Sequence, residues 1–184
     1  MGIIATNNTG KLNPIPDCYI RAQNYFIYMY SLPSINDTKS ADYNRENGMG
    51  RTQPFLTFNA GGMRTISWTC TFVSYDQEST ARNFGYLRIL EASVYPRRDP
   101  SNIVPYVPPV VMSIRCGDLL ANSGAELNAV LTSYNVDFPV DQVWNSEYNL
   151  ARYLPAKLDV RLSFDIVYDS RFLPGADRIL LLGA

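Results

Sequence analysis

The segment from Pro155 to Tyr168 has the most regular alternation of apolar and polar side chains in the chain. Because successive side chains of a strand point to opposite faces, this alternation predicts a strand with one face on a core and the other in water. The apolar positions are Leu158, Val160, Leu162, Phe164, Ile166 and Tyr168. The positions between them carry both signs of charge, which favours an antiparallel sheet that is wetted on one side.

Further strands are predicted at 18–32, 54–58, 64–75, 110–116 and 127–138. Segment 18–32 is apolar or aromatic on both faces, so it is either covered on both sides within its own subunit or pressed on another subunit. Asn59 to Gly62 supply turn residues, which predicts a hairpin between 54–58 and 64–75 with positive φ angles at the turn. Segment 64–75 alternates cleanly and is the expected partner of the strand at 157–168.

One helix is predicted at 76–95, with Asp76 or Ser79 as its N-terminal cap and Pro96 as its end. Three- and four-residue spacing places one apolar stripe on the sheet: Phe84, Leu87, Leu90 and Val94. Tyr86 and Ile89 project away from that stripe. They are either covered by a loop of the same subunit or contact a neighbouring subunit, so both are candidate inter-subunit residues.

The remaining segments are expected to be irregular. Residues 1–17 are predicted as an N-terminal arm, 33–53 as a long loop inserted in a single domain that spans 18–169, and 96–109 as a proline-rich linker. Residues 139–154 form a second long connection. In the tail, 170–184, four consecutive apolar residues either fold back into their own domain or dock on an adjacent subunit: Ile179, Leu180, Leu181 and Leu182.

These elements predict an α+β fold that is mainly β: an antiparallel β-sandwich or barrel with one helix packed against it and long extended arms and loops. A chain of 184 residues is large enough to bury a core. No leader or membrane-length apolar run is recognised, so we expect a soluble protein, made in the cytoplasm, without a membrane partner.

Composition argues against several function classes. The net charge is −1, with 16 Lys and Arg against 17 Asp and Glu and no basic cluster, so a nucleic-acid-binding surface is not expected. Histidine is absent, which removes the usual general base and the commonest metal ligand. We therefore predict no enzyme activity, no catalytic residues and no cofactor.

The cysteines and the loop carboxylates are not predicted to form a disulfide or a metal site. Cys18, Cys70 and Cys116 are odd in number and widely spaced, which indicates buried free thiols in a reducing compartment. Asp137 and Asp141 flank Phe138-Pro139-Val140 and could in principle hold a divalent cation. Acids at the start of a loop are more typical of turns, so no metal site is predicted.

Several stretches together resemble a known family. They are YLRILEASVYP (86–96), VPPVVMSIRCGD (107–118), AVLTSYNVDFPVD (129–141) and YLPAKLDVRLSFDIVYD (153–169), with RTISWTCTF (64–72) upstream of the helix. This succession of helix, proline-proline entry strand, strand ending in an acidic loop, and proline-led last strand resembles the tube-forming domain of contractile phage tails. The closest likeness is to the baseplate proteins that start the tube.

The resemblance implies a structural virion protein of the tail or baseplate. It implies a homo-oligomeric ring, a hexamer, that stacks with tail-tube and baseplate hub proteins and lets DNA pass during ejection without binding it specifically. The arm and the 33–53 loop do not match the family pattern, so tube initiator and major tail-tube subunit both stay open. The alternative from another class is a capsid decoration protein or a minor neck protein with a β-sandwich.

Overall fold

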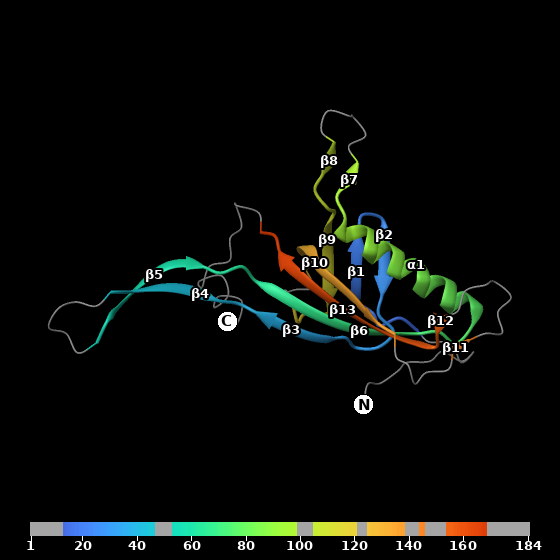
Figure 1. The fold of residues 1–184 in the computed structure, drawn as a ribbon. Helices are drawn as coiled ribbons and strands as arrows, with labels where there is room; N and C mark the ends of the chain where they lie inside the picture. Colours follow the sequence, from blue (N-terminus) through green and yellow to red (C-terminus); the bar gives the residue numbers. More distant parts are fainter. Residues whose placement is uncertain are drawn as a thin grey trace.

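The computed structural model describes residues 13–46, 53–98, 105–120, 125–138, 144–145 and 154–168. These residues contain one helix, α1 (Gln77–Val94), which lies against a seven-stranded sheet (Figure 1). The sheet strands are β1 (Cys18–Ala22), β2 (Tyr25–Tyr28), β3 (Ser34–Thr38), β6 (Thr65–Val73), β9 (Val111–Cys116), β10 (Leu127–Asp137) and β13 (Lys157–Ile166). Three two-stranded pairs join β4 (Ala41–Glu46) to β5 (Phe55–Gly61), β7 (Arg97–Arg98) to β8 (Tyr106–Val107), and β11 (Trp144–Asn145) to β12 (Leu154–Pro155).

The strand predicted from the most regular alternation lies inside this sheet. The strand order is β2-β1-β9-β10-β13-β6-β3, and every neighbouring pair is antiparallel. β13 pairs with β10 on one side and β6 on the other, so the predicted pairing with segment 64–75 is confirmed. The predicted inward face is confirmed as well, since its members are at most 4% exposed: Leu158, Val160, Leu162, Phe164 and Ile166.

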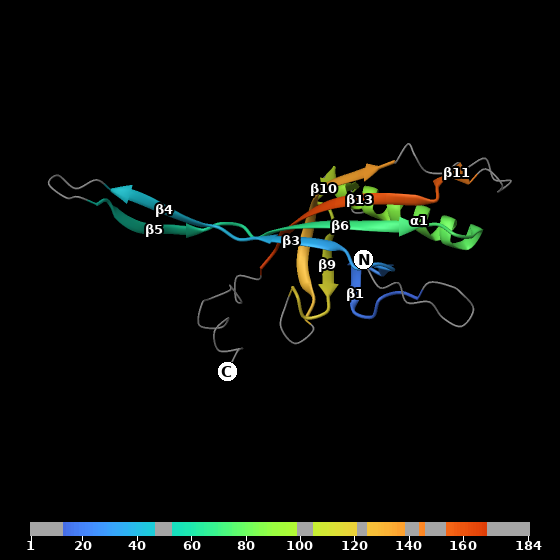
Figure 2. The same ribbon diagram turned by 90° about the horizontal axis from the view of Figure 1, so that it is seen from below.

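Helix α1 forms where the sequence predicts it. Asp76 is the N-cap, and its Oδ1 atom accepts a hydrogen bond of 2.6 Å from the backbone N–H of Ser79. Leu87 and Leu90 are buried in one hydrophobic cluster with Trp68 and Phe164 of the sheet. The helix contacts β6 and β10, and Figure 2 shows it lying along one side of the sheet. The α+β, mainly β fold with one helix packed against the sheet is therefore confirmed for the described residues.

The predicted single strand at 18–32 is wrong, because the chain reverses within it. β1 and β2 form a tight hairpin in which Ala22 pairs with Tyr25. Gln23 in the turn has φ 55°, a left-handed conformation that side chains other than Gly, Asn and Asp seldom adopt. Gln23-Asn24 lacks the glycine that usually marks such a turn, so the sequence signal was missing.

The loop predicted at 33–53 and the hairpin predicted across 54–75 are also corrected. Residues 34–46 form β3 and β4, β3 pairs with β6, and β4 pairs with β5. The chain therefore runs onward from β5 into β6 instead of folding back, and Gly61 and Gly62 have no positive φ angle. These polar strands are held by backbone ladders to a neighbour, and such ladders need no apolar period.

Two predicted connections contain short paired segments. β7 and β8 pair within the predicted linker 96–109, and β11 pairs with β12 within the predicted connection 139–154. Other predictions lie outside the described residues, namely those on residues 1–12, on Asp141 and on the tail 170–184. In the described part of the chain, no helix is both long and apolar enough to cross a membrane.

Candidate interaction surfaces

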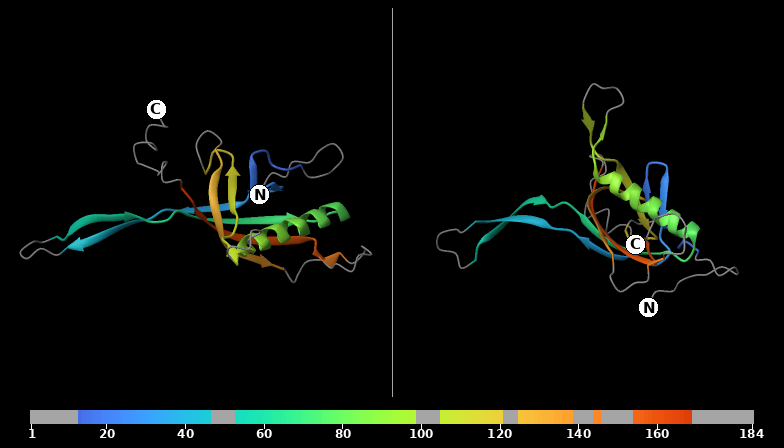
Figure 3. Two further views of the ribbon diagram at one scale, coloured as in Figure 1. Left: turned by 90° about the horizontal axis from the view of Figure 1, so that it is seen from above. Right: turned by 45° about the vertical axis from the view of Figure 1, so that its right-hand side comes forward.

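The β4–β5 pair, residues 41–46 and 55–61, is an arm that projects from the body of the molecule. Figures 1 and 3 show that it continues in the direction of β3 and β6 and extends beyond the seven-stranded sheet. All thirteen of its residues are exposed, six in β4 and seven in β5. An isolated two-stranded hairpin is marginally stable in water, so this arm lacks the support that the sheet has.

One face of the arm is mainly apolar. Tyr43 pairs with Phe58 across the two strands, and their rings meet edge to face with centroids 5.6 Å apart. Leu56 lies on the same face, since side chains two positions apart share a face. Its cross-strand partner there is Arg45, so the face also carries one cation. Their exposed fractions are 52% for Tyr43, 59% for Phe58 and 62% for Leu56. The opposite face is more polar and carries Asn44, Glu46, Phe55 and Thr57.

The root of the arm is fixed by ionic contacts. Arg64 donates to both carboxylate oxygens of Asp37, at 2.9 and 2.8 Å, and also to the carbonyl of Leu120 at 3.0 Å. The Lys39 ammonium lies 3.2 Å from the same carboxylate. The Arg64 hydrogen bonds are the main reason that the pKa of Asp37 lies below its ordinary value of 3.8. The arm is therefore held firmly where it leaves the sheet.

A glycine lies at the same junction. The Gly62 N–H donates to the Ser40 carbonyl at 2.8 Å, which continues the ladder between β3–β6 and β4–β5. A β-carbon at Gly62 would lie 2.0 Å from the Ser40 hydroxyl and 3.2 Å from its Cβ and carbonyl oxygen. The backbone at residue 62 and Ser40 can thus approach closely because residue 62 has no side chain.

A second surface is the aromatic cluster Tyr19, Phe26 and Tyr28 at the β1–β2 edge. Phe26 and Tyr28 stack at 5.8 Å, and Tyr19 meets Phe26 edge to face at 5.4 Å. Phe26 and Tyr28 are 39% and 38% exposed. Tyr19 donates to Glu126 at 2.7 Å, and this bond is the main reason that the pKa of Tyr19 is raised. The sequence leaves open whether one face of this segment contacts another subunit. This cluster is the partly exposed face, and its contact with a subunit stays a prediction.

The outer face of β6 and β13 is polar. Thr71 donates to Asp159 at 2.6 Å and Thr65 to Asp165 at 2.9 Å, so hydroxyls and carboxylates alternate across the pair. The cations nearby are matched by carboxylates, since Lys157 lies 3.5 Å from Asp159 and Arg161 lies 2.8 Å from Asp137. A surface built this way offers little positive charge to a phosphate backbone.

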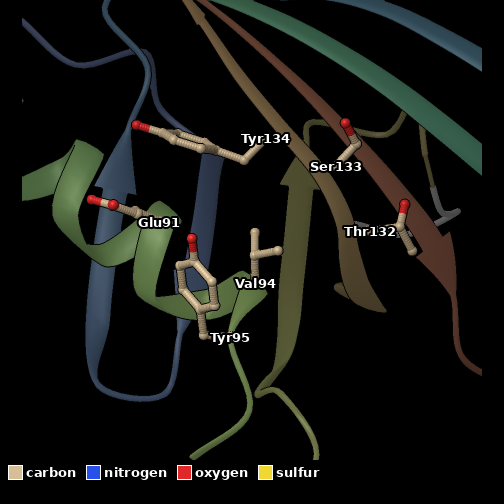
Figure 4. A pocket seen from close by; sticks show the side chains of 6 residues that line it. All are labelled: Glu91, Val94, Tyr95, Thr132, Ser133 and Tyr134. Atoms are coloured by element: carbon tan, nitrogen blue, oxygen red, sulfur yellow. The ribbon is translucent and has the colours of Figure 1, made fainter.

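A pocket of about 300 Å³ lies between the C-terminal end of α1 and the bulge in β10. Its lining comprises Glu91, Val94, Tyr95, Thr132, Ser133 and Tyr134, and Figure 4 shows Tyr134 reaching from β10 toward the helix. Burial, reinforced by the nearby Glu91, raises the pKa of Tyr134 to about 12. The lining supplies one carboxylate, two alcohols and two phenols.

The predicted contact residues are only partly placed by the structure. The prediction that Tyr86 and Ile89 project away from the core-facing stripe is wrong, because both are half-buried and pack against the hydrophobic core. The Tyr86 ring lies 5.9 Å from that of Phe72. Any contact of their remaining surface with a neighbour stays a prediction. Ile179, Leu180, Leu181 and Leu182 lie outside the described residues. The three cysteines are buried free thiols, as predicted, and no cluster of metal-binding side chains occurs among the residues described.

Sequence reasoning missed the apolar face of the arm. Leu56 and Phe58 do alternate with Thr57 and Asn59, so half of the signal was present. The partner strand was hidden, because β4 carries a single large apolar residue, Tyr43, within a polar segment that had been interpreted as a loop.

Comparison with known proteins adds little. No family model matches the sequence, and no curated protein matches it. A solved structure described as "Tail of empty GTA particle computed with helical refinement, C6 symmetry" contains a chain that aligns with a TM-score of 0.36 and 12% sequence identity. The alignment covers 89% of this chain and 100% of that one. Because a TM-score this low does not show a common fold, function is derived below from this chain's own residues.

Proposed function

We propose that this protein is a ring-forming structural subunit of a contractile phage tail, in the tail tube or in the baseplate ring that starts it. The observation that carries the proposal is the β4–β5 arm, a projecting hairpin with an exposed, mainly apolar face. That face carries Tyr43, Leu56 and Phe58 beside Arg45. Fully burying an exposed apolar side chain of this size is worth roughly 1.5–3 kcal/mol, and about half of each remains to be buried here. A neighbouring copy that covers this face would therefore be favoured.

Two further features support an assembly subunit. The ionic root at Asp37 and Arg64 fixes the direction of the arm, as a repeated contact between identical subunits requires. The aromatic cluster at the β1–β2 edge is a second partly exposed apolar surface. Two separate contact surfaces on one subunit are what a closed ring needs, because each copy must meet two neighbours.

The proposal includes a passive role toward DNA and no catalytic role. The polar face of β6 and β13 has hydroxyls and charge-matched ion pairs, which suits a wall past which DNA slides. Charge matching keeps phosphate binding weak, and weak binding allows passage. The resemblance of the sequence to tube-forming proteins supports the same role.

The test is assembly of the purified chain, measured by sedimentation velocity and negative-stain imaging at rising protein concentration. The wild type should form rings of uniform size. A Tyr43→Ser/Phe58→Ser variant should stay monomeric. An Asn44→Ser/Thr57→Ser variant, altered on the opposite face of the same arm, should assemble like the wild type. A wild type that stays monomeric at every concentration, or a Tyr43/Phe58 variant that forms the same rings, would refute the proposal.

A further inference from the structure

Two buried cysteines face each other across β1 and β9. Cys18 is the first residue of β1, Cys116 is the last residue of β9, and the two are direct partners in the antiparallel register. They are 1% and 3% exposed, and their Sγ atoms lie 3.4 Å apart. Both are free thiols.

The backbone around them has the spacing that a disulfide requires. The Gly117 N–H donates to the Asp17 carbonyl at 2.8 Å, which makes 17 and 117 a hydrogen-bonded pair. The adjoining pair, Cys18 and Cys116, is therefore a non-hydrogen-bonded one, with Cα atoms about 4.5 Å apart and side chains directed close together. A disulfide spans Cα separations of about 4.4–6.8 Å, so small side-chain rotations suffice to bring the sulfur atoms into bonding distance.

We propose that Cys18 and Cys116 form a redox site that a hydroperoxide converts to a disulfide, which ties β1 to β9. This inference goes beyond the proposed function and does not depend on it.

The chemistry follows from the contact between the two thiols. The Cys18 S–H donates to the Cys116 Sγ, which lowers the pKa of Cys116 and raises that of Cys18. Cys116 is therefore the nucleophile, because the thiolate is the reactive form. Its sulfur attacks one peroxide oxygen, the O–O bond breaks, and the departing hydroxide takes a proton to become water. Cys18 then attacks the sulfenic sulfur of Cys116, and the oxygen leaves as a second water with the remaining protons. Two thiols and one hydrogen peroxide thus yield one disulfide and two water molecules.

The disulfide would close one edge of the sheet. In the strand order, β2 and β1 form that edge and are paired to the rest of the sheet through β9. The cross-link joins residues 98 positions apart. A long closed loop restricts the unfolded chain strongly, so the oxidised protein should resist unfolding better than the reduced one.

The third cysteine supplies a matched control. Cys70 is 2% exposed and lies on β6, which pairs with β3 and β13 and with neither strand of the proposed site. It shares the core cluster with Cys18 and contributes only a minor part of the rise in the pKa of Cys18. Burial raises the pKa of Cys70 to about 12, so its thiolate is scarce at neutral pH. Replacing Cys70 should leave the oxidation unchanged.

The experiment treats the reduced full-length chain with hydrogen peroxide, alkylates the remaining thiols, and maps linked peptides by mass spectrometry. The wild type and Cys70→Ala should each lose two alkylatable thiols and yield one peptide pair that joins Cys18 to Cys116. Their Tm should rise by roughly 10 °C and return on reduction. Cys116→Ala should show neither effect. Any of three results with the wild type would overturn the proposal: three alkylatable thiols after treatment, a link through Cys70, or oxidation of Cys116 to the sulfinic acid without a link. These results do not depend on how the variants fold.

Discussion

The seven-stranded sheet and the β4–β5 arm are both antiparallel β-structure, yet they are stabilised in different ways. In the sheet, every second side chain of β13 is at most 4% exposed and packs in a core shared with α1. In the arm, both faces are exposed, and the large apolar side chains Tyr43, Leu56 and Phe58 are more than half exposed. The sheet carries its own hydrophobic stabilisation, whereas the arm relies on the backbone ladder and on its root. Under the proposed function, the arm is the part of the subunit that a partner completes.

The largest expected effect is a difference in folding stability between substitutions on the two faces of β13. Leu162→Asp should destabilise the fold by more than about 4 kcal/mol, because it places an unpaired charge at a position that is 2% exposed. Arg161→Gln, at the next residue, should cost less than about 1 kcal/mol, because its pair with Asp137 lies at the surface. Chemical denaturation measures both. Equal damage from the two substitutions would show that the register is wrong.

The next effect concerns the root of the arm and depends on pH. The folded-state pKa of Asp37 is lowered, so its contribution to stability is present above its ordinary pKa of 3.8 and is lost as the pH falls through the folded value. Asp37→Asn should remove roughly 0.5–1 kcal/mol at neutral pH. Below the folded pKa, the variant and the wild type should converge. A stability difference that persists unchanged at low pH would argue against the Asp37–Arg64 ion pair.

A smaller effect is expected in the arm itself. In the monomer, Tyr43→Ser/Phe58→Ser should change the free energy of unfolding by less than about 1 kcal/mol, because the two rings contact each other and water rather than the core. Thermal unfolding of the monomer measures this change. A loss of several kcal/mol would mean that the arm folds onto its own subunit.

The smallest expected effect is on duplex DNA. With a net charge of −1 and matched ion pairs on the face of β6 and β13, binding should disappear at physiological salt. A gel-shift titration at several salt concentrations measures it. A complex that survives 150 mM salt, roughly the physiological ionic strength, would contradict a passive role.

The sequence predicted the parts of this fold in which burial and periodicity coincide. β13 and β6 were found because one face of each is apolar at a regular spacing. α1 was found from its N-cap and from Leu87 and Leu90, although its buried face also includes Ser79, Asn83 and Ser93. β3 and β4 were missed because their side chains are mostly polar and leave no apolar period. The β1–β2 turn was missed because Gln23 takes a conformation that is usually marked by glycine. The apolar face of the arm emerges only when Tyr43 and Phe58 are paired, which requires the register. The Cys18–Cys116 contact was hidden for the same reason.

The most direct test of the account is amide hydrogen exchange, followed by mass spectrometry, on dispersed and concentrated protein. In the dispersed chain, amides of 41–46 and 55–61 should exchange orders of magnitude faster than those of β13, because the arm can open locally while the sheet cannot. In the assembled protein, exchange in the arm should slow toward that of the sheet, and exchange in β13 should stay unchanged. Arm amides that exchange equally fast in both states would contradict the claim that a neighbouring subunit completes the arm.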